Sequence, residues 1–204
     1  MLWLNDTKFA AAPRITVAEG VYASTRLAGA DGWLRAGDVK PGDQLLTFDA
    51  GLLPVLHVHR HRIAPDAPVQ DWPILIPAGT LGTHEALRLP PEQTVLVEAD
   101  LAEELYSEAF VSVPALALEG WRGCTRVPPP DEDVMTITLE TAQLVYAGND
   151  LLVGLAGQPT LNALLQGDMS SAVPLGPSAA RHLIACMIAE EAGAELRRAA
   201  MGAN

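Results

Sequence analysis

Residues Gly20–Gly51, GVYASTRLAGADGWLRAGDVKPGDQLLTFDAG, combine three turn signals with short runs of strand-forming residues, and this stretch decides the fold. Asp31-Gly32 suits a tight hairpin turn because both residue types tolerate positive φ, so residues 24–28 and 33–34 are expected to be the hairpin arms. Pro41-Gly42-Asp43 predicts a second turn, ahead of the apolar run 44–48. Asp49-Ala50-Gly51 closes the stretch, which therefore predicts compact β structure.

The bulk composition limits the classes of protein to which the chain can belong. Its 204 residues, 49% of them hydrophobic, fit one domain with or without an appendage. There are 13 Lys and Arg against 25 Asp and Glu, so the formal net charge is −12. This charge repels phosphate backbones and anionic lipids, and nucleic acid is not an expected partner. No apolar run approaches the ~18 residues that a membrane span requires.

Two further features of the composition concern cysteines and targeting. Cys124 and Cys186 are the only cysteines, and they are expected to be buried free thiols, with a disulfide between them as the alternative. Residues 1–19 lack the basic front and apolar core of a standard secretory signal, so the cytoplasm is the default location. No glycine-rich phosphate loop or nucleophile elbow is present, and no cofactor is expected.

The run 52–63, LLPVLHVHRHRI, has the alternation of a strand and carries three histidines on one face. His57, His59 and His61 are candidates for a transition-metal site because imidazole is a common ligand. Residues at this spacing spread over roughly 13 Å of strand, too far to meet one ion unless the strand bends. A solvated, basic edge strand is therefore the favoured interpretation, and no metal is expected.

Helical and further strand segments follow along the chain. Residues 98–110 predict a short acidic helix, and residues 134–150 a pair of strands. Residues 157–177 are typical of a linker or irregular cap. Residues 178–201 predict an amphipathic helix that either covers an open face of the β domain or pairs with a second copy or another protein. Its apolar stripe is Leu183, Ile184, Met187, Ile188, Ala192 and Leu196.

Three segments of the chain resemble one known family. The order Thr-Arg-Leu at 25–27, Asp-Gly-Trp at 31–33 and Pro-Gly-Asp at 41–43 is similar to the opening of the Hint domain, the autoprocessing module shared by hedgehog proteins and inteins. The segments IPAGTLG at 76–82 and VSVPAL at 111–116 match bacterial Hint-containing proteins further along. The resemblance implies a mainly β, disk-like fold with pseudo-twofold strand arms, followed by the C-terminal helix. It divides the chain into a leader (1–19), a Hint-like domain (20–156) and a linker with helix (157–204).

The resemblance also assigns positions to the catalytic groups of the family. The cysteine that attacks the preceding peptide bond falls on Gly20, a Ser or Thr on Pro90, the proton-shuttling His on Gln93 and a second His on Ala142. Glycine has no nucleophile, and glutamine hydrogen-bonds but does not titrate near neutrality. No catalytic residue is therefore assigned.

Other groups that can replace the missing ones are weaker candidates. Ser24 and Thr25 are possible substitute nucleophiles, although a hydroxyl is a poor nucleophile without a base. His84 lies in a segment expected to form the far loop of a hairpin, and Asn204 is interpreted as a plain chain end. We expect a Hint-derived domain that no longer cleaves itself and serves binding or assembly, with an unidentified protein or a second copy as partner. The alternative is a weak autoprocessing domain that uses Ser24 or Thr25 to release an N-terminal peptide of about 20 residues.

Overall fold

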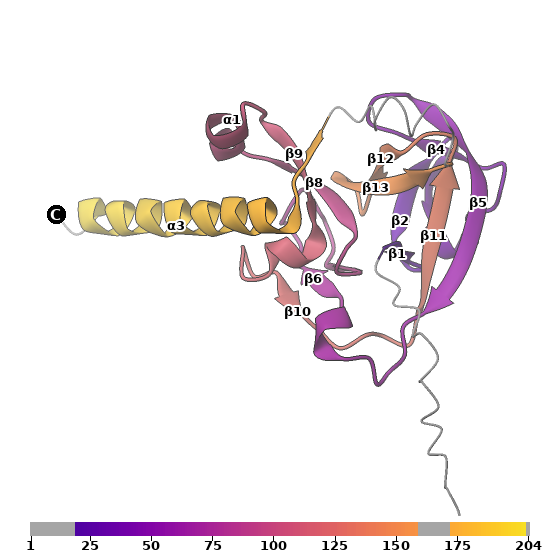
Figure 1. Cartoon of the computed structure of the whole chain (residues 1–204), viewed down its shortest axis with the longest axis horizontal. Helices are drawn as coiled ribbons and strands as arrows, with labels where there is room; N and C mark the ends of the chain where they lie inside the picture. Colours follow the sequence, from indigo (N-terminus) through magenta and orange to yellow (C-terminus); the bar gives the residue numbers. More distant parts are fainter. Residues whose placement is uncertain (1–18, 159–171, 203–204) are drawn as a thin grey trace, which may run out of the picture.

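The computed structural model describes residues 19–158 and 172–202, and in this part of the chain the fold is mainly β (Figure 1). The sequence-based prediction of a mainly β fold with a C-terminal helix is confirmed. The predictions for Asn204, for residues 1–18 and for most of the linker lie outside the described residues. The strands are β1 (Val21–Tyr22), β2 (Arg26–Gly29), β3 (Gly32–Arg35), β4 (Gln44–Leu46), β5 (Leu52–Arg62), β6 (Ile74–Ile76), β7 (Leu87–Leu89), β8 (Thr94–Glu98), β9 (Phe110–Pro114), β10 (Thr125–Arg126), β11 (Asp133–Leu139), β12 (Gln143–Ala147), β13 (Leu151–Gly157) and β14 (Val173–Pro174).

The hairpin predicted around Asp31-Gly32 is β2–β3, with its turn one residue earlier than expected. Gly29 pairs with Gly32, so the two turn residues are Ala30 and Asp31. Gly32 has φ +113 and is the first residue of β3. The sequence predicted a residue of positive φ within the turn. In the structure this residue, Gly32, lies directly after the turn, where glycine allows the chain to continue into the next strand.

Six of the strands form a closed circuit. In the described residues the main sheet has eleven strands, within which β11, β5, β4, β2, β12 and β13 follow one another and a β11–β13 pairing closes the path. Five of these pairings are antiparallel, and the closing one is parallel. Closure leaves fewer exposed edges and surrounds a core of branched aliphatic side chains such as Leu27, Leu45 and Val145, all fully buried.

The histidine-bearing strand β5 is long and pairs antiparallel with β11. His57, His59 and His61 lie opposite Thr138, Thr136 and Val134 of β11. Within the described ranges no strand pairs with the other side of this segment, as expected of an edge strand.

Three further strands extend the main sheet away from the closed circuit (Figure 1). β8 continues from β13, β9 pairs with β8, and the short β14 adds in parallel to β9. β14 supplies regular structure within the segment expected to be irregular. Strands β10, β6 and β7 form a separate small sheet. The predicted acidic helix is α1 (Asp100–Tyr106), which ends at Ser107 in the left-handed conformation, φ 61.

The C-terminal helix α3 (Pro177–Gly202) covers the β structure with its first turns and then projects away from it (Figure 1). Ala180, Leu183, Ile184 and Met187 are buried, in contact with the hydrophobic core. Leu196 is 73% exposed, so the apolar stripe is only partly covered. No helix in residues 19–158 and 172–202 is long and apolar enough to span a membrane.

Candidate functional site

A buried glutamine holds the peptide bond that precedes the first strand. Gly20 lies just before β1, and Gln93 lies in the turn between β7 and β8. The amide N–H of Gly20 donates to Oε1 of Gln93 over 2.8 Å. This N–H belongs to the Glu19–Gly20 peptide, so the side chain at position 93 binds the peptide group that the family resemblance identifies as the cleavage point.

The amide nitrogen of the Gln93 side chain donates two hydrogen bonds. Nε2 donates to the carbonyl oxygens of Gly154 (2.7 Å) and Thr94 (3.0 Å), and the residue is only 2% exposed. The backbone N–H of Gln93 donates to the carbonyl of Pro90 over 3.1 Å, which closes the turn. A carboxamide does not titrate near neutral pH, so the Gln93 side chain binds the peptide group by hydrogen bonding alone.

Position 20 has no room for a side chain. Gly20 has φ +134, a conformation that residues with a Cβ rarely adopt. A Cβ at this position would lie 2.7 Å from Cγ1 of Val134 and 2.9 Å from the carbonyl oxygen of Met135. Both neighbours belong to β11, which pairs with β1 through Val21 and Met135. A nucleophilic side chain therefore does not fit here unless β1 and β11 separate.

Ala142, the position to which the resemblance assigns the second histidine, lines a cavity that also contacts residues of the Gln93 network. The cavity has a volume of about 350 Å³ and lies along β13. Its lining includes Ala142 and Glu19, together with Thr94 and Gly154, whose carbonyl oxygens accept from Gln93. The positions assigned to the nucleophile and to the two histidines of the family are thus linked through one hydrogen-bond network and one cavity.

Among the described residues that line this cavity, Glu19 is the one with an ionisable side chain. Its side chain keeps contact with solvent, but partial burial raises the pKa of the carboxyl, and the negative charge of Glu92 raises it further.

Ser24 and Thr25 line a different, smaller cavity. Its volume is about 140 Å³, and neither Gln93 nor Ala142 contributes to it. Ser24 is exposed, and its backbone N–H donates to a carboxylate oxygen of Glu132. Thr25 is 6% exposed, with its backbone N–H bonded to the carbonyl of Tyr22. Both hydroxyls therefore lie apart from the Gln93 network.

The histidines do not join the Gln93 network either. His84 is exposed in the loop between the paired strands β6 and β7, where the sequence places it. Neighbouring ring centroids of His57, His59 and His61 are 6.5 and 6.4 Å apart along β5. Among the residues that the structure describes, no group of three or more His, Cys, Asp or Glu side chains is placed to hold a metal ion.

Two glycines of β13 shape the site and were not singled out from the sequence. The carbonyl of Gly154 anchors Gln93, and a Cβ on Gly157 would collide with the amide nitrogen of Ala142. Glycine inside a strand commonly marks the close approach of another segment. The pattern LLVGLAG at 151–157 carried this signal.

The sequence profile of the Hint domain matches residues 20–152. The chain belongs to the Hint-domain family, and the predicted Hint-type fold is confirmed. No curated protein matches the chain.

Several solved structures are similar to this one, all at low sequence identity. A bacterial intein-like domain from Clostridium thermocellum is 13% identical, with a TM-score of 0.48, and the match covers 66% of this chain and 97% of that one. The MchDnaB-1 intein is 15% identical, with a TM-score of 0.43 and coverages of 67% and 99%. The gp41-1 intein is 14% identical, with a TM-score of 0.40 and coverages of 65% and 95%.

Proposed function

We propose that this Hint domain has lost self-cleavage and acts as a binding or assembly module. The hydrogen bond from the Gly20 amide to Gln93 carries the proposal, because it keeps the contact to the peptide while replacing the group that would move a proton. Loss of one acid–base group costs on the order of 10²–10⁴-fold in rate. Here the nucleophile is absent as well, and its position is too tightly packed to hold one.

The proposal is tested by the mass of the intact chain. Purified protein is held for days with and without hydroxylamine or dithiothreitol, which capture ester and thioester intermediates. The expected result is a constant 21.6 kDa under every condition. Release of a peptide that ends at Glu19 would contradict the proposal.

The second candidate is weak autoprocessing by Ser24 or Thr25. The observation in its favour is that Ser24 is exposed in a cavity that Glu85 and Glu132 also line, which supplies carboxylates as bases. This candidate requires cleavage in the intact-mass experiment and its loss in the Ser24→Ala or Thr25→Val variant. Cleavage that survives both substitutions would exclude these hydroxyls.

A further inference from the structure

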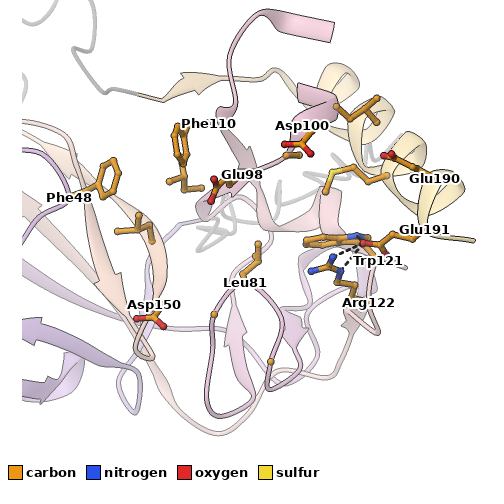
Figure 2. Close-up of a pocket in the computed structure, with 17 residues that line it drawn as sticks. Phe48, Leu81, Glu98, Asp100, Phe110, Trp121, Arg122, Asp150, Glu190 and Glu191 are labelled. Carbon is orange, nitrogen blue, oxygen red and sulfur yellow. Dashed lines mark hydrogen bonds and ion pairs between the residues drawn. The ribbon is translucent and has the colours of Figure 1, made fainter. Parts of the chain in front are cut away.

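A groove on another part of the molecule shares no described lining residue with the cavity that Glu19 and Ala142 line. It has a volume of about 680 Å³, and it lies between α1, α3 and the loop that joins β6 to β7 (Figure 2). This volume is within the range of ligand-binding clefts and exceeds that of a single side chain. The groove is thus large enough to hold several residues of another chain.

One wall of the groove is aromatic and open to solvent. Phe48 follows β4 and Phe110 begins β9, and each is 39% exposed. Their ring centroids are 6.5 Å apart, so the two rings form one apolar surface. Figure 2 shows both on the same side of the groove, with Leu81 below them. Neighbouring exposed aromatic side chains are enriched where proteins bind partners.

Five carboxylates lie among the apolar residues and glycines of the rest of the described lining. Its carboxylates are Glu98, Asp100, Asp150, Glu190 and Glu191. Arg122 is the one cation among the described lining residues, and it already has two partners. Its Nη2 lies 2.7 Å from Oε1 of Glu191, and its guanidinium lies 4.7 Å from the Trp121 ring centre. No cation in the described part of the chain pairs with the other four carboxylates.

We propose that this groove binds a cationic peptide segment of a partner protein, with an apolar side chain on Phe48 and Phe110 and Lys or Arg side chains facing the carboxylates. The proposal rests on the binding role proposed above and names the chemistry of the partner. Several carboxylates around a partly enclosed groove create a negative potential that attracts such a segment. The same potential disfavours a second copy of this chain, whose net charge is −12.

The test uses the full chain and a short fluorescent peptide that alternates lysine with phenylalanine and leucine. Two matched peptides carry glutamate in place of lysine, or serine in place of the apolar residues. The expected result by fluorescence anisotropy is binding of the first peptide only, with an affinity that falls as salt is raised. Phe110→Ala and Glu98→Gln should each weaken binding about ten-fold. Trp33→Ala and Glu195→Gln are matched controls, since both residues are exposed outside the groove, and should leave affinity unchanged.

Four outcomes would overturn the proposal. These are no binding of the lysine peptide, equal binding of the glutamate peptide, equal losses in the groove and control variants, and a dimer of the free protein that Phe110→Ala dissociates. The last outcome would indicate that a second copy of the chain occupies the groove. The intact mass of the same sample is measured in parallel, so that cleavage would contradict the loss of autoprocessing independently of the peptide result.

Discussion

Gly20 and Gln93, 73 residues apart in sequence, are joined by a buried hydrogen bond of 2.8 Å between a backbone amide and a side-chain carboxamide. The same carboxamide reaches Gly154 on β13. The uncharged side chain of Gln93 thus connects the residue that precedes β1 with strand β13.

Replacing Gln93 should therefore cost stability. Gln93→Ala leaves the amide of Gly20 and the carbonyl of Gly154 without their partner in a buried site, and we expect a loss of about 3 kcal/mol in the free energy of unfolding. Urea denaturation measures it. The control is Gln143→Ala, whose amide bonds to the exposed Thr141 hydroxyl and should cost about 0.5 kcal/mol. Equal losses in the two variants would contradict a structural role for the Gln93 network.

Adding a side chain at Gly20 should cost more than adding one at another glycine of positive φ. Gly20→Ala combines an unfavourable φ with a collision against β11, and the expected loss is about 3 kcal/mol. Gly51→Ala is the matched control, because Gly51 has φ +69 and open space around its Cβ position, so about 1 kcal/mol is expected. Thermal or urea unfolding compares them. If Gly20→Ala were as stable as the parent, position 20 would have room for a nucleophile.

The sequence predicted the β segments well because turns and alternation are local signals. The hairpin β2–β3 and the strand β5 follow directly from Asp31-Gly32 and from the run of alternating histidines. The circuit closed by β11 and β13 was not predicted from the residues, because strand order depends on contacts between distant segments.

The candidate site was predicted only in part, for a similar reason. The family resemblance placed Gly20 and Gln93 in the same site, but their hydrogen bond and the role of Gly154 depend on three-dimensional packing. The groove beside α3 had no sequence signal at all. Phe48, Phe110 and Glu190 come from three separate parts of the chain and meet only after folding.

The carboxyl of Glu19 should make stability depend on pH. Its pKa is raised above the ordinary 4.5 in the folded state, so the folded chain favours the protonated form and its stability falls as pH rises through the folded pKa. Glu19→Gln removes this loss. The variant should be more stable than the parent at a pH above the folded-state pKa, and this gain should vanish as the pH falls below the ordinary value of 4.5. Denaturation across this range checks it, with Glu195→Gln on the exposed part of α3 as control. A gain that does not change with pH would exclude the carboxyl as the cause.

The two halves of α3 should contribute unequally to stability. Leu183 is fully buried against the core, and Leu183→Ala should cost about 3 kcal/mol. Leu196 is 73% exposed, and Leu196→Ala should change stability by less than about 0.5 kcal/mol. Both substitutions replace leucine by alanine in the same helix, so the change in helix propensity cancels. Chemical denaturation gives the comparison, and a large loss at Leu196 would show that the projecting part of the helix is covered in solution.

The two cysteines should differ in their reaction with thiol reagents. Both are free, Cys124 is buried, and Cys186 is partly exposed. Burial also raises the pKa of the Cys124 thiol to about 11, so at pH 8 this group is protonated as well as inaccessible. Iodoacetamide at pH 8 should therefore modify one cysteine rapidly in the native protein, and peptide mapping should identify it as Cys186. In urea both should react. Rapid modification of Cys124 in the native protein would contradict its burial in the hydrophobic core. Failure of both cysteines to react in urea without reductant would indicate a disulfide.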